Sequence, residues 1–261
     1  MFTKRYYYLI KTQYLGYRFH GWQKQPKLKT VHLMIDRTFK YILEDEAYFK
    51  TLASGRTDAM VSANEAAFEL FLHHKIEDEI EFLALFNKNL PQDIRALSIE
   101  EVDAKFNIIQ DSKIKEYLYL FTHTEKCHPF CAPLLTTFLD TLDVELMKKG
   151  AALFEGMHNF KTYCYKPSDT GVYQREILTC ELVENTVFTA NFFPEKSYVL
   201  RVRGKGFGRN QIRLMMGALV KLGRGEITLD YIKTTLQPDS VEVMDYIAPA
   251  SGLILNKIEF E

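Results

Sequence analysis

Cysteine is scarce in this sequence, with four residues in a chain of 261. So few cysteines exclude the disulfide framework of a small secreted scaffold and favour reduced thiols in a cytoplasmic protein. Cys127 and Cys131 form the one close pair, and no second ligand pair with the spacing of a metal site accompanies them. Because a structural zinc ion needs four ligands, we expect no metal site there.

Long apolar runs are absent as well. No uninterrupted apolar stretch approaches the roughly 20 residues that cross a bilayer. Lys4 and Arg5 lead into a tyrosine-rich stretch instead of the long apolar core of a secretory leader. We therefore expect a protein of the cytoplasm that makes no contact with membranes.

The chain also lacks an excess of either charge, since its formal net charge is −1 at pH 7. A neutral balance argues against indiscriminate nucleic-acid binding. The charges are nevertheless unevenly spread: residues 1–35 and residues 201–225 each carry seven lysines or arginines and no acidic residue. The two segments together suit one phosphate-facing groove, and the same pattern also fits ordinary solvated charge.

Alternating strand and helix patterns indicate an α+β fold. Several predicted strands follow one another with hairpin-length gaps, which favours largely antiparallel sheets over a doubly wound parallel sheet. A boundary near residue 103 divides the chain into halves at 1–103 and 104–261. Strands are expected at 6–14, 66–72, 94–102, 117–121, 176–182, 198–203 and 254–260, and helices at 31–42, 78–87, 143–154 and 207–222. Residues 49–52 are expected to lead into the turn at Arg56 and Asp58.

The segment from Ala53 to Ala59 places a carboxylate two residues after an arginine, on a turn of small residues. Small residues let another backbone or a ligand come close. Arg56 can keep Asp58 ionised and oriented, and an ionised, positioned carboxylate acts as a nucleophile or a general base. A turn closed by a purely structural Arg–Asp pair explains the same residues equally well.

Arg209 and Arg213 lie four residues apart in the predicted helix 207–222, so they share one face, which Gly217 extends by a further turn. Arginines beside a bare glycine suit the close approach of a phosphate or carboxylate. A solvated helix face is the alternative interpretation.

Eight sequence blocks together resemble the TruA-type tRNA pseudouridine synthases, and they occur in that family's order along the chain. The blocks are Phe19-His20-Gly21-Trp22-Gln23, Thr30-Val31, Gly55-Arg56-Thr57-Asp58-Ala59, Asn87 with Leu90-Pro91 and Asp93-Ile94, Lys115-Glu116-Tyr117-Leu118-Tyr119, Gly156-Met157-His158-Asn159-Phe160, Asn210-Gln211-Ile212-Arg213 with Gly217, and Ala248-Pro249-Ala250-Ser251-Gly252-Leu253. Any one block is a weak signal, but eight in order are specific.

The resemblance implies two similar α+β halves whose antiparallel sheets join into one platform, with helices on the outer face and a central active-site cleft. It implies a homodimer without a cofactor that isomerises uridine to pseudouridine in tRNA, in the anticodon stem-loop region. By resemblance, Asp58 is the catalytic aspartate, Arg56 is its motif partner, and Tyr117 packs on the target base. Arg213 pairs with the aspartate, and Leu253 lines the uracil pocket. The other expected substrate contacts are His20, Trp22, Gln23, Thr57, Arg209 and Asn210.

Two stretches depart from the family pattern. The family continues past the aspartate with Gly-Val-His-Ala, where this chain has Met60-Val61-Ser62-Ala63. The family's Phe-His-Ala-Arg before the tyrosine strand is Phe106-Asn107-Ile108-Ile109 here. A histidine and a basic RNA contact are therefore missing, which points to a different RNA or a different uridine rather than to another reaction.

Two other functions fit parts of the sequence. A non-catalytic protein that binds or remodels RNA on the same fold would tolerate both departures, although it would have no need of Asp58 and its arginines. A carboxylate-dependent glycoside hydrolase needs two carboxylates across one bond, and no second acid stands out beside Asp58.

Overall fold

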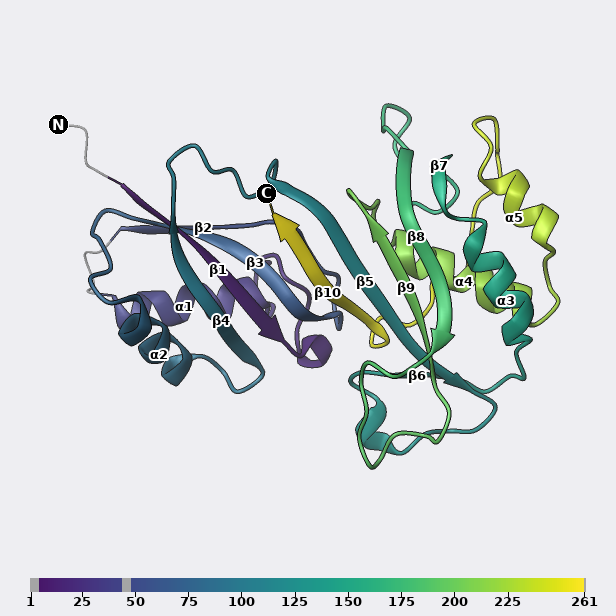
Figure 1. Ribbon diagram of the computed structural model, residues 1–261, viewed down its shortest axis with the longest axis horizontal. Coiled ribbons are helices and arrows are strands. Elements are labelled where there is room, and N and C mark those ends of the chain that lie inside the picture. Colours follow the sequence, from purple (N-terminus) through teal and green to yellow (C-terminus); the bar gives the residue numbers. More distant parts are fainter. Residues whose placement is uncertain (1–4, 44–47, 261) are drawn as a thin grey trace. The chain divides into compact units, whose positions relative to one another are not determined.

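The structure is a computed structural model that describes residues 5–43 and 48–260, so Lys4 lies outside the described residues. The chain forms two compact units, and each is built around its own strands (Figure 1). The first unit comprises Met1–Lys113 together with Leu255–Glu261, and the second comprises Ile114–Ile254. None of the helices in the described part of the chain is long and apolar enough to cross a membrane.

The first unit is built on antiparallel strands that carry two helices. Its elements are β1 (Tyr6–Tyr14), the 3-10 helix η1 (Gly16–Arg18), α1 (Val31–Ile42), β2 (Phe49–Ala53), β3 (Ser62–Leu72), α2 (Glu79–Asn89), β4 (Ile94–Val102) and most of β10 (Leu253–Phe260). β1 pairs with both β3 and β4, and β2 pairs with the C-terminal half of β3. The predicted boundary at residue 103 falls inside this unit, directly after β4.

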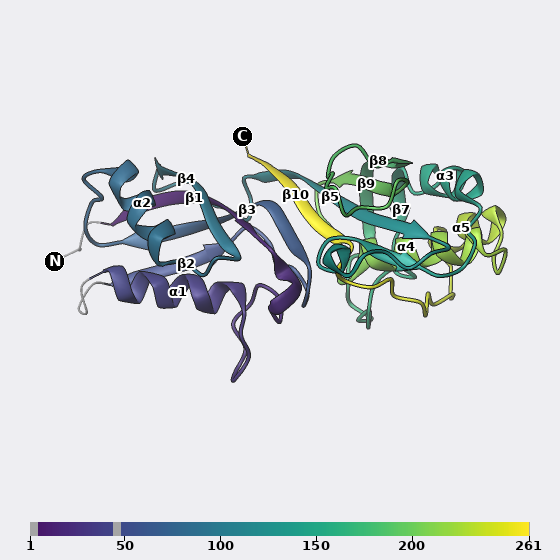
Figure 2. The same ribbon diagram turned by 90° about the horizontal axis from the view of Figure 1, so that it is seen from below.

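Side-chain caps and stacked rings set the two helices of this unit on its strands. Thr30 begins α1 and Asp78 begins α2, because each side chain accepts a backbone N–H from the first turn of its helix. Phe39 of α1 is fully buried and stacks on Phe86 of α2, with ring centroids 4.3 Å apart. It also contacts Phe68 of β3 at 6.1 Å, and Figure 2 shows α1 running beneath the strands of this unit.

The second unit combines strands with three helices. Its elements are β5 (Ser112–His123), the 3-10 helix η2 (Pro129–Cys131), β6 (Thr136–Phe138), α3 (Val144–Ala152), β7 (Gly156–Asn159), β8 (Gln174–Glu184), β9 (Tyr198–Gly204), α4 (Gln211–Gly223) and α5 (Leu229–Thr235). The strands follow the order β5-β9-β8-β7, all antiparallel, while β6 lies parallel to β5. α4 is buried along almost its whole length and packs against α3.

The predicted α+β fold with largely antiparallel strands is confirmed, and several predicted elements are corrected. Four short elements, β2, β6, β7 and α5, were not expected from the sequence pattern. β3 and β5 begin earlier than predicted, at Ser62 and Ser112. The late helix begins at Gln211 instead of Phe207, because Asn210 takes a left-handed backbone conformation with φ of +56° that an α-helix does not contain.

Candidate active site

Asp58 lies in the turn that joins β2 to β3. Ser54 closes the turn, because its backbone N–H and its hydroxyl both donate to the Ala67 carbonyl, at 3.1 and 3.0 Å. Within the turn Arg56 is exposed, Thr57 is buried, and Asp58 is half-buried. Asp58 is therefore partly exposed on a turn whose base is tied to the sheet.

The loop of residues 19–23 holds this turn through its backbone. The Trp22 N–H donates to the Thr57 carbonyl at 3.1 Å, one residue before the aspartate. On the other side of the aspartate, the Met60 N–H donates to the Phe19 carbonyl at 3.0 Å. Two motifs that are distant in sequence thus form one hydrogen-bonded clamp around the catalytic candidate.

The clamp requires glycine at position 21. Gly21 has a φ of +86°, and a Cβ there would lie 2.6 Å from the Thr57 carbonyl oxygen and 3.1 Å from the carbonyl carbon of Asp58. The Thr57 side chain is fixed too, since its hydroxyl shares a hydrogen bond of 2.8 Å with the Tyr14 hydroxyl. Thr57 therefore holds the turn from inside and does not reach the surface.

Trp22 is also an internal residue, with 3% of its surface exposed. Its ring packs against Tyr14, His32 and Phe68, with centroid distances of 5.9, 5.8 and 6.1 Å. Burial lowers the pKa of His32, so the ring beside the tryptophan favours its neutral form. The predicted contacts His20 and Gln23 lie instead on the exposed part of the same loop.

The departures at positions 60 and 62 differ in how the local structure accommodates them. Met60 takes a left-handed φ of +67°, which explains why glycine suits this position in the family. The Ser62 hydroxyl is buried and accepts the Gly16 N–H at 2.9 Å. A Cβ on Gly16 would lie 2.0 Å from the Val61 carbonyl oxygen, so the two segments touch directly. Ser62 thereby ties the end of the turn to the segment after β1.

In the second unit, the predicted contacts Arg209 and Asn210 lie in the loop before α4, not within the helix. The sequence argument that Arg209 and Arg213 share a helical face is therefore wrong. Arg209 is held by the preceding loop, because its carbonyl accepts the Tyr165 N–H at 2.9 Å. Its guanidinium lies 4.9 Å from the centre of the Tyr165 ring, and the Lys166 ammonium lies 5.4 Å from the same ring. Two cations thus gather around one aromatic side chain.

Arg213 is anchored to the loop that follows residue 245. Its Nε donates to the Ala248 carbonyl at 2.7 Å, and the Ala248 N–H donates to the Arg213 carbonyl at 3.1 Å. The loop lies directly on α4 at Gly217, where a Cβ would meet the Tyr246 carbonyl oxygen at 1.9 Å. This close approach gives the bare glycine of the late helix a structural role.

The far end of the same loop is fixed by β5. The Tyr119 hydroxyl, fully buried, donates to the Pro249 carbonyl at 2.8 Å, and the Leu120 N–H donates to the Gly252 carbonyl at 2.8 Å. Burial raises the pKa of Tyr119 far above its usual range, so the phenol remains a hydrogen-bond donor. Leu253 follows directly and is buried, with 6% of its surface exposed.

Tyr117 lies on β5 two residues before Tyr119, so the two rings share one face of the strand. The Tyr117 ring meets Phe207 edge to face, with centroids 5.3 Å apart. Lys115 is two residues earlier on that face, and burial lowers its pKa. Tyr117 is half-buried, which leaves part of the ring accessible for stacking.

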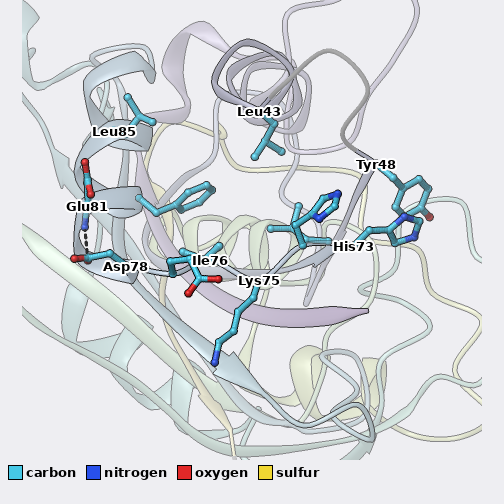
Figure 3. Close-up of a pocket in the computed structure, with 12 residues that line it drawn as sticks. Leu43, Tyr48, His73, Lys75, Ile76, Asp78, Glu81 and Leu85 are labelled. Atoms are coloured by element: carbon cyan, nitrogen blue, oxygen red, sulfur yellow. Dashed lines mark hydrogen bonds between the residues drawn. The ribbon is translucent and has the colours of Figure 1, made fainter. Parts of the chain in front are cut away.

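A pocket of about 350 Å³ in the first unit is separate from the Asp58 turn (Figure 3). Tyr48 and His73 stack at its edge, with ring centroids 4.4 Å apart, beside the first residues of β2 and the last of β3. The Asp58 turn joins the opposite ends of these strands. Asp78 and Glu81 also line the pocket, and their carboxylates disfavour a phosphate ligand.

Comparison with known proteins agrees with the blocks found in the sequence. The tRNA pseudouridine synthase family profile matches residues 151–261. A tRNA pseudouridine synthase A of Exiguobacterium sibiricum is 32% identical over 243 residues, which cover 93% of this chain and 92% of the relative. The chain belongs to the tRNA pseudouridine synthase family. A tRNA pseudouridine synthase A 2 of Bacillus thuringiensis is 29% identical over 259 residues, which cover 97% of this chain and 99% of the relative. A tRNA pseudouridine synthase A of Dictyoglomus thermophilum is 26% identical over 260 residues, which cover 96% of this chain and 98% of the relative.

In this synthase family member, each unit gathers part of the predicted residue set. The first unit holds the Asp58 turn and the loop of residues 19–23 that clamps it. The second unit holds Tyr117, the arginines around the start of α4, and Leu253. Among residues 5–43 and 48–260, no group of three or more histidine, cysteine, aspartate or glutamate side chains is placed to hold a metal ion.

Sequence reasoning missed two residues that the structure draws into the candidate site of the synthase. Tyr165 and Lys166 lie near Arg209 only through a contact between loops, so no spacing in the sequence predicts that these residues are neighbours. Tyr119 was part of a recognised block, but its role depends on a hydrogen bond to Pro249 across 130 residues. In the sequence, only the alternation of Tyr117 and Tyr119 along the strand indicates that their rings lie on the same face.

Proposed function

We propose that this protein isomerises uridine to pseudouridine in tRNA, with Asp58 as its catalytic residue. Membership of the synthase family supports the reaction. The observation that carries the assignment of Asp58 is the turn itself, which the loop of residues 19–23 holds on both sides of the aspartate while Asp58 remains partly exposed. A purely structural Arg–Asp pair would not explain this arrangement, because Arg56 is exposed and the clamp is made by backbone groups.

The chemistry needs a carboxylate and a way to hold a flipped base. Pseudouridine formation breaks the C–N glycosidic bond and joins the same ribose to carbon 5 of uracil. Since the product is an isomer of the substrate, no oxidant, reductant or group donor is consumed, and no cofactor is required. Asp58 acts at the ribose, either by forming a covalent adduct or by assisting deprotonation. Tyr117 stacks on the uracil once it has left the RNA helix.

Arg213 is proposed to pair with Asp58 and keep it ionised. This assignment rests on the family resemblance. Its support from the second unit is the fixed position of Arg213, which is bonded twice to Ala248 on a loop tied to Tyr119. An arginine held in one orientation loses little entropy when it meets its partner.

The remaining predicted residues are proposed to have different roles, which for most of them follow their exposure. His20, Gln23 and Arg209 are exposed and are proposed to contact RNA directly. Trp22 and Thr57 are buried and are proposed to hold the Asp58 turn in place. Asn210 sets the start of α4, and Leu253 is proposed to line the uracil pocket.

The finer assignments are proposals drawn from the family. They are a homodimer in the cytoplasm that modifies uridine in the anticodon stem-loop region. Ser62, one of the departures from the family pattern, has a structural role of its own, because its hydroxyl accepts the Gly16 N–H.

Tritium release from tRNA labelled at carbon 5 of uracil tests the proposal. The full chain, Asp58→Asn, and Asp239→Asn as a matched control at an exposed carboxylate after α5, are compared on unmodified total tRNA. We expect release from the wild type and the control and none above background from Asp58→Asn, while all three bind tRNA within a few-fold.

Other results would change the assignment in defined ways. Continued release by Asp58→Asn would remove Asp58 from the mechanism without removing the reaction. Tight binding of tRNA with no release by any of the proteins would favour the non-catalytic RNA-binding alternative. Sequencing of the modified product then identifies the position of the uridine.

A further inference from the structure

The second unit contains a cysteine pair that the proposed reaction does not use. Cys127 and Cys131 lie in the loop between β5 and β6, around the short helix η2. The Cys131 N–H donates to the His128 carbonyl at 2.9 Å, so the chain turns back on itself between the two cysteines. Cys127 is half-buried, whereas Cys131 has 1% of its surface exposed.

The two cysteines share one apolar cluster. Cys131 is buried in the cluster that includes Leu118 and Val199, and Cys127 packs against it. The Cys131 thiol also donates to the Phe192 carbonyl at 3.2 Å. Burial raises the pKa of Cys131, which keeps this sulfur protonated and slow to react on its own.

Solvent reaches only one of the two sulfurs through a defined opening. A pocket of about 430 Å³ lies between this loop and the loop before β9, and Cys127 lines it together with Lys126, His128 and Lys196. Cys131 does not line the pocket. A small oxidant entering the pocket therefore meets Cys127 first, while Cys131 lies buried in the cluster against which Cys127 packs.

We propose that Cys127 and Cys131 are a redox modification site that closes to a reversible disulfide when the protein meets a peroxide. The Cys127 thiolate attacks the peroxide oxygen, so the O–O bond breaks, and gives a sulfenic acid and hydroxide. The Cys131 sulfur then attacks the Cys127 sulfur, its proton and the sulfenic oxygen leave as water, and the S–S bond forms. A small thiol returns both groups to the reduced state.

Closure would change the contact between the two loops. The disulfide has no S–H group, so the Phe192 carbonyl loses the donor it has in the reduced protein. The Phe192 ring packs against His128 and Phe130, with centroid distances of 6.2 and 5.9 Å. The oxidised state is thus expected to loosen this aromatic contact at the rim of the pocket.

Alkylation and mass spectrometry of the full chain test the site independently of any RNA activity. Native protein is treated with hydrogen peroxide, then denatured in N-ethylmaleimide and digested. We expect oxidised protein to carry two fewer adducts than reduced protein, and a peptide lighter by two hydrogen atoms that contains Cys127 and Cys131. Dithiothreitol added before the maleimide should restore all four adducts, one for each cysteine of the chain.

Single variants separate the pair from general thiol oxidation. In Cys131→Ser, we expect Cys127 to accumulate as a sulfenic acid that dimedone captures, while half-buried Cys164 serves as the internal control. In Cys127→Ser, Cys131 should remain alkylatable after peroxide. The proposal is overturned if wild-type protein yields no linked peptide, if Cys127 and Cys164 oxidise at equal rates without loss of Cys131, or if the disulfide joins two chains on a non-reducing gel.

Discussion

Met60 shows how a single residue can carry strain beside a catalytic turn. Its backbone is left-handed, with φ of +67°, and its side chain is 37% exposed, so little burial offsets the strain. Such a conformation costs an L-residue about 1–2 kcal/mol relative to its preferred regions. Backbone strain of this kind tends to persist where the surroundings determine the geometry, here the Met60 N–H bonded to Phe19.

Replacing Met60 by glycine is expected to stabilise the protein. Glycine removes the left-handed penalty but adds unfolded-state entropy, so we expect a net gain of about 0.5–1 kcal/mol in the free energy of unfolding. Urea unfolding measures the change. Met60→Ala, which keeps the Cβ and its penalty, is the matched control and should gain nothing; a larger gain for alanine than for glycine would show that the side chain, not φ, is the source of strain.

Glu69 is a second residue whose position has an energetic cost. It lies on β3 with 2% of its surface exposed, and burial raises its pKa above the usual range. Because the folded pKa is the higher one, the stabilising contribution of this group is complete below its unfolded pKa of about 4.3 and is lost as the pH rises through the folded value. The ionised form at neutral pH is thus the less favourable one.

Glu69→Gln is therefore expected to be more stable than the wild type at pH 7. The advantage should shrink as the pH falls and disappear near pH 4, where the wild-type carboxyl is protonated as well. Urea unfolding at a series of pH values measures it. Glu100→Gln, on exposed β4 surface, is the control and should show no such trend; a parallel trend in that control would assign the effect to net charge.

At the scale of elements, the loop of residues 246–252 is the clearest example of a segment ordered by its neighbours. It contains no helix or strand, yet α4 and β5 fix it at several points, through Arg213, the bare Gly217 and Tyr119. Its hydrogen bonds go to elements distant in sequence, which satisfies its backbone without regular structure. The loop in turn holds Arg213 in place.

Tyr119→Phe is expected to lower turnover by about tenfold, a loss of roughly 1.4 kcal/mol of transition-state stabilisation, with a smaller change in KM. The reason is that loss of the hydroxyl frees the loop that orients Arg213, and the acid limb of the rate–pH profile should shift with it. Tritium release at several pH values measures this.

A second buried tyrosine provides the matched control for that experiment. The Tyr163 hydroxyl shares a hydrogen bond of 2.7 Å with Thr235 of α5, away from the loop. Both Phe variants should lose about 1 kcal/mol of stability, but Tyr163→Phe should keep its turnover. Equal losses of activity would assign Tyr119 a structural role only.

At the scale of the whole molecule, tertiary contacts pair most basic side chains of segment 201–225 with carboxylates. Five of its seven basic residues form salt bridges with carboxylates from other parts of the chain. These pairs are Arg201–Glu181, Arg203–Glu116, Lys205–Glu176, Lys221–Asp245 and Arg224–Asp140. Arg209 instead lies over Tyr165 with Lys166 nearby, so we infer that these two cations are available to bind RNA phosphates.

The salt dependence of tRNA binding tests that inference. Arg209→Ala and Lys166→Ala should each reduce the slope of log Kd against log salt by about one, as expected when one phosphate contact is lost. Filter binding from low to moderate salt measures the slope. Lys233→Ala, an exposed lysine of α5 paired with Asp230, is the control and should leave it unchanged; unchanged slopes for all three variants would place the RNA elsewhere.

Long, periodic elements were predictable because their own side chains specify them. β1, β4 and α1 lie where the residue pattern places them, since apolar alternation or spacing over nine or more residues determines which face is buried. β6, with three residues, and β7, with four, carry too little pattern and form only by pairing with β5 and β8. Helix α4 was placed too early because a left-handed Asn210 has no signature in apolar spacing.

The sequence by itself determined the family, the reaction expected of it and the aspartate on which that reaction is proposed to depend, because ordered motifs need no knowledge of contacts. Tertiary structure decided what each motif residue does. Burial separates Trp22, which holds the turn, from His20, which faces solvent. Partners far along the chain decide which arginines are neutralised and which thiol bonds to the Phe192 carbonyl. These properties depend on distances through space, which spacing along the chain does not encode.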